Sequence, residues 1–104
     1  MSESNVPARP QEVVNLEHPI IRGEQKVTRV AVRKPLAGEL TGLSLRDIVD
    51  MEATAMLRLL PRITEPPLLD FEVARLDPTD FLALSAEASG FFLPMAARPV
   101  SQPQ

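Results

Sequence analysis

The sequence has no cysteine, tryptophan or tyrosine, and it has only one histidine and four phenylalanines. Without cysteine the chain cannot form the disulfides that often stabilise small secreted domains, which favours a reducing compartment and predicts a cytoplasmic protein. One histidine without cysteine cannot build a typical zinc site. The few aromatic rings leave little surface for stacking on nucleic-acid bases.

Long apolar runs are also missing. No run approaches the roughly 18 residues that a membrane span needs, and the N-terminal stretch MSESNVPARPQEVV has no apolar core of a signal peptide. The formal net charge of −3 argues against a bulk electrostatic nucleic-acid binder, which is usually basic. We therefore expect neither a membrane nor a nucleic acid as partner.

The rest of the composition is typical of a small folded protein. The chain has 104 residues, of which 44% are hydrophobic and 24% charged, enough for a single domain. Polar, proline-containing segments at 1–11 and 94–104 are expected to be disordered tails. Between them, residues 12–93 are predicted to form one small α+β domain, with an N-terminal β-hairpin followed by about three short helices.

Two β-prone runs predict the hairpin. The first contains Val13, Val14 and Leu16, and the second has Val30 and Val32 on one face, which fits a half-buried antiparallel strand. Gly23 and Glu24 lie between the runs, and we expect a loop longer than two residues there. The second strand should end at Pro35, which cannot donate to a sheet, and Gly38 gives the exit its turn freedom.

Helix signals follow the strands. Leu40, Leu43 and Leu45 are expected to turn toward the core, and Ser44 to cap a short helical turn through Ile48. Asp50 is predicted to cap a helix whose apolar stripe is Ala53, Met56, Leu57 and Leu60, and Pro61 should end or kink it near Leu60. The TEPP segment then reads as a connector, and a short helix is expected at about 68–75.

The stretch LDPTDFLALSAEASGFF has the clearest helix start in the chain. Asp77 fits an N-cap, Pro78 the first helical position, and Asp80 adds negative charge near the helix N-terminus. Phe81, Leu84, Ala88 and Phe91 fall on one stripe with Phe92 beside it, while Asp80 and Glu87 should point elsewhere.

The sequence gives little support for catalytic activity. No serine lies in a nucleophile elbow and no glycine-rich loop resembles a phosphate cradle. The acids Asp47, Asp50 and Glu52, and the pair Asp77 and Asp80, fit metal or acid–base work, but they fit helix caps and a solvated face better. We expect no enzyme activity, no catalytic or metal-binding residue and no cofactor.

The charge is unevenly distributed. Residues 22–34 hold five basic side chains against Glu24 alone, whereas residues 35–104 hold ten acids and five bases. A positive hairpin on a negative body fits docking of an acidic partner or orientation of a second copy of the chain. It fits better an edge strand whose basic residues discourage aberrant strand pairing. Arg29, Arg33 and Lys34 are the partner-binding candidates from this region.

The end of the last helix supplies the other candidates, Phe81, Leu84, Phe91 and Phe92. Phe91 and Phe92 are consecutive, so on a helix their side chains point about 100° apart. Either the two rings pack on the hairpin and on a neighbouring helix, or one is exposed and anchors a partner, as aromatic residues often do.

Two segments together resemble the tail assembly chaperones, or tail assembly proteins, of Mu-like prophages and related tailed phages. VTRVAVRKPLAGEL is similar to the family's strand followed by Arg-x-Pro-x-x-Gly-(Asp/Glu)-Leu. LDPTDFLALSAEASGFF is similar to its final helix, which opens on Leu-Asp-x-x-Asp and closes on Phe-Phe. The resemblance covers about residues 13–93, although Pro61 and the pair at 66–67 depart from the smoother middle helix of the family.

The resemblance implies a non-enzymatic assembly helper in the cytoplasm of a bacterial host. Such a protein binds the tape measure protein, keeps it soluble, helps recruit tail tube subunits and is absent from the finished virion; self-association is also compatible. The alternative is a small cytoplasmic adaptor, or an antitoxin-like or inhibitor protein, that acts by protein–protein binding.

Relatives in this functional class often make a second, longer product by programmed ribosomal frameshift near the end of the short form. Here Phe91-Phe92-Leu93 is compatible with a slippery codon run, T TTT TTG. Other codons encode the same residues, so this expectation needs the DNA sequence.

Overall fold

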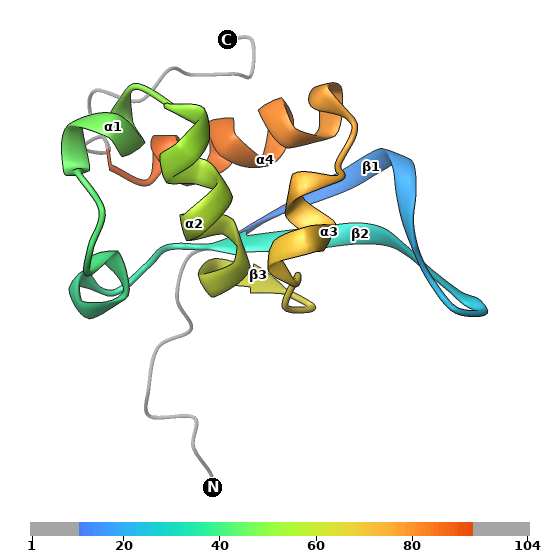
Figure 1. The fold of residues 1–104 in the computed structure, drawn as a ribbon. Coiled ribbons are helices and arrows are strands. Elements are labelled where there is room, and N and C mark those ends of the chain that lie inside the picture. Colours follow the sequence, from blue (N-terminus) through green and yellow to red (C-terminus); the bar gives the residue numbers. More distant parts are fainter. Residues whose placement is uncertain (1–10, 93–104) are drawn as a thin grey trace, which may run out of the picture.

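The computed structural model describes residues 11–92, and these form a three-stranded sheet with helices packed on it (Figure 1). The elements in chain order are β1 (Gln11–Arg22), β2 (Gln25–Arg33), the 3-10 helix η2 (Ala37–Leu40), α1 (Leu45–Val49), α2 (Ala53–Ile63), β3 (Thr64–Glu65), α3 (Asp70–Ala74) and α4 (Pro78–Gly90). The expected α+β class, with an N-terminal hairpin followed by helices, is confirmed. The expected tails lie outside the described residues, apart from Gln11, which begins β1.

The hairpin turn is shorter than expected. β1 and β2 pair antiparallel, with Arg22 opposite Gln25, so only Gly23 and Glu24 connect them. Gly23 has a φ of +60°. Glycine with positive φ at the first central position is the pattern of a type II′ turn, which joins two strands by two residues. The prediction of a longer loop was therefore wrong.

The pairing of β1 with β2 is interrupted between Asn15 and Ile20. Asn15 lies opposite Arg29 and Ile20 lies opposite Val27, so β1 carries extra residues and bulges there. A helix outside the sheet holds the bulge, because backbone N–H groups of the bulge donate to a side chain at the start of α4. Both Glu17 N (2.8 Å) and His18 N (2.9 Å) donate to the carboxylate of Asp80.

This contact corrects the prediction for Asp80. The residue was expected to point away from the core, yet it is only 1% exposed. Its carboxylate accepts two backbone N–H groups, which satisfies the buried charge that would otherwise be costly. Its position at the third residue of α4 adds the favourable field of a helix N-terminus.

The TEPP segment holds a third strand that was expected to be a connector. β3 pairs antiparallel with β2 through Ala31 opposite Glu65 and Val32 opposite Thr64. The Thr64 hydroxyl also donates to Leu60 O at 2.8 Å, which ties the strand to the end of α2. β2 is thus the central strand where it meets β3.

The predictions for the segment after β2 are confirmed in part. Ser44 caps α1 as predicted, since its hydroxyl accepts from Asp47 N. Leu40 and Leu43 pack against the core, but Leu45 is 56% exposed, so its predicted inward direction was wrong. Ile48, one helical turn further on, is fully buried instead.

The middle helix differs from its prediction at both ends. Glu52, not Asp50, caps α2 by accepting from Ala55 N, and Asp50 ends α1. The helix continues through Pro61 to Ile63. Pro61 has no N–H to donate to the carbonyl four residues earlier, yet the chain stays helical to Ile63, so the helix does not end near Leu60 as predicted. The buried stripe is Ala55, Met56, Leu59, Leu60 and Ile63, whereas the predicted Ala53 and Leu57 are exposed.

The last helix begins as predicted. Asp77 caps α4 by accepting from Thr79 N at 2.9 Å, and Pro78 occupies the first turn. The predicted stripe is largely confirmed: Leu84, Ala88 and Phe91 are buried. The core that these helices close over the sheet consists of Leu16, Val30, Val32, Ile48, Ala55, Met56, Leu59, Leu60, Ile63, Leu68, Val73, Leu84, Ala88 and Phe91.

Candidate functional site

The VTRVAVRKPLAGEL stretch forms a hydrogen-bonded clasp at the exit of β2. The guanidinium of Arg33 donates to both carboxylate oxygens of Glu39 and, at 2.9 Å, to Arg62 O. Glu39 also accepts from Leu36 N at 2.8 Å, and Arg62 in turn donates to Glu39 O and Thr41 O. The hydrogen bond to Glu39 raises the pKa of Arg33. The clasp fixes how the chain leaves the sheet and enters η2.

The partner-binding candidates from the sequence do not share one surface. Arg29 and Lys34 are exposed, Arg33 is half-buried in the clasp, and Phe81 and Phe92 are half-buried against the core. Leu84 and Phe91 belong to the core itself.

Three of these candidates nevertheless meet. Lys34, Phe91 and Phe92 line a concavity of about 230 Å³ together with Pro35, Ala37 and Leu40. The strand exit and the end of α4, which the sequence indicated separately, are therefore neighbours. We call this concavity the strand-exit pocket.

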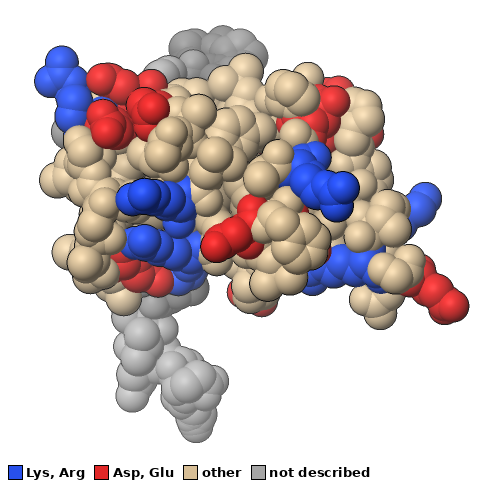
Figure 2. Space-filling model, viewed as in Figure 1, with Lys and Arg blue, Asp and Glu red and all other residues tan. Residues whose placement is uncertain are grey.

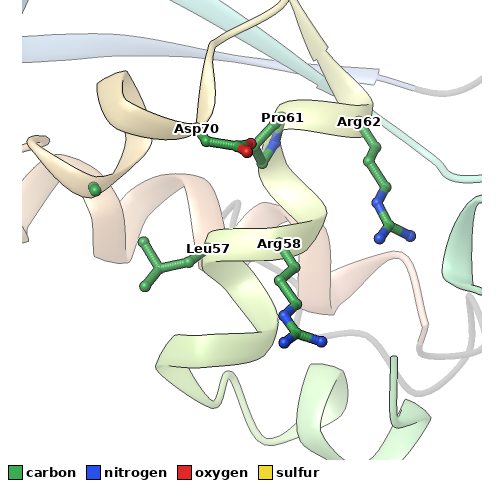
Figure 3. A pocket seen from close by; sticks show the side chains of 6 residues that line it. Leu57, Arg58, Pro61, Arg62 and Asp70 are labelled. Carbon is green, nitrogen blue, oxygen red and sulfur yellow. The ribbon is translucent and has the colours of Figure 1, made fainter. Parts of the chain in front are cut away.

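A second concavity lies between α2 and α3 (Figure 3). It measures about 440 Å³ and is lined by Leu57, Arg58, Pro61, Arg62, Asp70 and Ala74. In Figure 3 the Arg58 and Arg62 side chains extend away from α3, whereas Asp70 points across toward Pro61. Arg62 lines this groove and also donates to Glu39 O and Thr41 O in the clasp, so its charge already has partners within the chain.

A third region joins the hairpin tip to α3, and sequence reasoning missed it. Arg22 Nε and Nη2 donate to the two oxygens of Glu72, each at 2.8 Å, and Nη2 also donates to Pro67 O at 2.8 Å. Glu72 also accepts from Leu69 N at 2.9 Å. The Arg22 hydrogen bonds, followed by the one from Leu69, lower the pKa of Glu72 to about 2. The same pairing raises the pKa of Arg22.

Apolar side chains surround this ion pair at the surface. Ile21 is 61% exposed, Leu69 55% and Phe71 57%. They border two concavities of about 550 and 310 Å³, and Ile21, Phe71 and Glu72 line both. We call the area formed by Ile21, Pro67, Leu69 and Phe71 the hairpin–α3 surface. In Figure 2 the part of the molecule over the hairpin and α3 shows tan surface with both blue and red groups, including a red group at the hairpin tip.

Four of the five acidic residues considered for chemistry have structural partners. Asp77 and Glu52 are helix caps, Asp50 pairs with Arg46 at 3.2 Å, and Asp80 binds the β1 bulge. His18 is exposed, with Nδ1 3.6 Å from Asp77 Oδ2. Over residues 11–92 no three His, Cys, Asp or Glu side chains group so as to hold a metal ion. In that same range no helix is long and apolar enough to cross a membrane.

Comparison with known proteins gives a family and two relatives. Residues 13–93 match the model of the family described as phage tail assembly chaperone proteins, E, or 41 or 14. Tail assembly protein E of Escherichia phage P2 is 40% identical over 84 residues, which is 81% of this chain and 92% of that protein. Tail assembly protein E′ of the same phage is 40% identical over 83 residues, 80% of this chain, and the chain spans only 58% of E′. No solved structure matches.

Proposed function

This chain belongs to the phage tail assembly chaperone family, and on that premise we propose that it binds the tape measure protein and keeps it soluble while the tail is built. The resemblance drawn from the two sequence motifs is confirmed, and with it a role in phage tail assembly. The observation that carries the proposal is the family match over residues 13–93. Interaction with other tail proteins follows from that role.

The proposed action is shielding without catalysis. A long client with apolar helical segments exposes many similar sites, and many small copies that each bind weakly cover it through multivalency. The chaperone then helps recruit tail tube subunits and leaves before the tail is complete, all in the cytoplasm of the bacterial host. An uneven charge distribution supports contact with partners of either sign.

The strand-exit pocket is one contact site in this proposal. It combines the exposed cation Lys34 with the half-buried ring of Phe92, so a client side chain can meet an apolar wall and a charge together. The other candidate from the hairpin edge, Arg29, is exposed on β2. Phe81, Leu84, Phe91 and Arg33 act in this proposal by holding those contact residues in place.

Co-expression tests the function. The tape measure protein encoded near this gene should be insoluble alone and soluble with this chain, and the two should co-purify. Lys34→Glu with Phe92→Ser should reduce the co-purified client, while Leu82→Ser, an exposed apolar residue (58%) outside the pocket, should not. Unchanged capture by the double variant, with an intact fold, would remove the strand-exit pocket from the account.

A further inference from the structure

The strand-exit pocket is built from the two sequence motifs alone. Each of its six lining residues lies in VTRVAVRKPLAGEL or in LDPTDFLALSAEASGFF. The first motif supplies one wall and the second supplies the other: Lys34, Pro35, Ala37 and Leu40, then Phe91 and Phe92. The two motifs, far apart along the chain, are therefore two halves of one concave site.

The aromatic wall is held by the core of the domain. Phe91 is 5% exposed and belongs to the core cluster. The Ser89 hydroxyl donates to Val49 O at 2.9 Å, which ties the end of α4 to α1. This wall therefore keeps its place through packing and needs no further device.

The other wall lies outside the core and is held differently. Of its four residues, Leu40 alone packs against the core, whereas Lys34 and Ala37 are exposed. The clasp pins this segment at its two ends, because Arg33 donates to both carboxylate oxygens of Glu39. The same carboxylate accepts from Leu36 N at 2.8 Å, in the middle of the segment. The wall is thus a short loop closed by an ion pair.

Arg62 fastens this loop to the end of α2. Its Nη1 donates to Glu39 O at 2.6 Å and to Thr41 O at 3.0 Å. Arg33 Nη2 donates to Arg62 O at 2.9 Å. The three residues of the clasp therefore form a ring in which each binds the other two. Such a ring locks the shape of a surface loop that packing leaves loose.

We propose that Glu39 and Arg62 are positioning residues for the strand-exit pocket, which hold its outer wall in the shape that receives the client. The inference rests on the proposed function, which places a client side chain in this pocket. Neither residue lines the pocket, so each acts through the loop that it holds. A loop that is already ordered loses less freedom on binding, so weakening the clasp should lower affinity although every contact residue remains.

Glu39→Gln tests the ion pair of the clasp. It removes the charge that Arg33 binds and keeps an oxygen that can accept from Leu36 N. The amount of co-expressed tape measure protein that co-purifies should fall about fivefold or more.

The matched control is Glu72→Gln, because Glu72 is held in the same way at another place. Its carboxylate pairs with Arg22 and accepts from Leu69 N, three residues earlier, as that of Glu39 pairs with Arg33 and accepts from Leu36 N. The Glu72 side chain is 5% exposed and that of Glu39 26%, so Glu72→Gln should lower stability at least as much. It lies outside the pocket, so capture should stay at the wild-type level.

Arg62→Gln tests the link from the loop to α2, and Arg58→Gln is its control. Both arginines are exposed on α2 and line the same groove (Figure 3), but only Arg62 takes part in the clasp. Each variant removes one positive charge, so a general effect of charge on capture would appear in both. Arg62→Gln should lower capture, whereas Arg58→Gln should leave it unchanged.

Hydrogen exchange on the free chain supplies a reading that does not depend on the client. Glu39→Gln and Arg62→Gln should speed exchange of the backbone amides in 36–43 and leave those of α4 unchanged. Glu72→Gln should instead speed exchange in 68–76. Urea midpoints of all four variants give the loss of global stability for comparison.

The outcomes separate the inference from the proposed function. If both clasp variants lose capture and loosen 36–43 while both controls keep capture, the inference stands. If capture falls in clasp variants and controls alike, in step with the urea midpoints, or falls in none of them, the inference is wrong and the chaperone function stands. If the clasp variants lose capture without faster exchange in 36–43, Glu39 and Arg62 contact the client themselves and positioning is wrong. If the wild type does not capture the client, the proposed function fails and the inference with it.

Discussion

Removal of the buried carboxylate at position 80 should destabilise the whole domain, although the residue takes part in no proposed contact. Asp80 is 1% exposed and accepts from Glu17 N at 2.8 Å and His18 N at 2.9 Å. It joins the start of α4 to the bulge in β1, and so fixes where the hairpin leaves the body.

The size of the effect follows from the two hydrogen bonds. A bond to a charged acceptor contributes about 1.5–3 kcal/mol, and unsatisfied buried donors remain when the acceptor is lost. Asp80→Ala should thus lower the free energy of unfolding by about 3 kcal/mol. For a domain of this size that is roughly 12–24 °C in Tm. Asp80→Asn keeps one acceptor oxygen and should cost about half as much.

Urea unfolding followed by circular dichroism measures this, since the chain has no tryptophan or tyrosine to report by fluorescence. The control is Asp70→Ala, an exposed acid in the first turn of α3, which should change stability by less than about 0.5 kcal/mol. Equal stability of Asp80→Ala and Asp70→Ala would refute the reasoning, because the bonds from the bulge would then contribute nothing.

Three further predictions follow from the ion pairs and from residues 91–93. The Arg22 pairing lowers the pKa of Glu72 from 4.5 to about 2, so the stability that this ion pair contributes is complete above pH 4.5 and is lost toward pH 2. The melting temperatures of wild type and Glu72→Gln should therefore converge on acidification. A difference in melting temperature that stays constant with pH would contradict this. Arg33→Lys cannot reproduce the two-pronged bond to Glu39 and should lower stability by about 1 kcal/mol, seen as a lower urea midpoint. Sequencing the DNA should reveal a slippery run at codons 91–93, and its absence there would end the frameshift expectation.

Local signals explain what could be predicted from the sequence. The Asp77–Pro78 start of α4, the Ser44 cap and the alternation of Val30 with Val32 depend on neighbours within a few residues, and the structure confirms each. The predicted start of α2 was wrong, because two nearby residues could each cap the helix. Asp50 and Glu52 are both plausible caps, and only packing decides that α2 starts after Glu52.

Contacts between distant residues account for the rest. Asp80 is buried because it meets a strand more than sixty positions earlier. The hairpin–α3 surface depends on Arg22 meeting Glu72, fifty positions apart. No periodicity in either segment indicates such a partner. β3 is too short, at two residues, to have a pattern of its own, and it becomes a strand only because β2 lies beside it.

The most direct test of the central proposal is co-expression with the tape measure protein, followed by size-exclusion chromatography with light scattering. A chaperone should yield a soluble complex in which one client carries several copies of this chain, and the measured mass gives the number of copies. A client that aggregates equally with and without the chain, and with any longer product of the same gene, would contradict the proposed function.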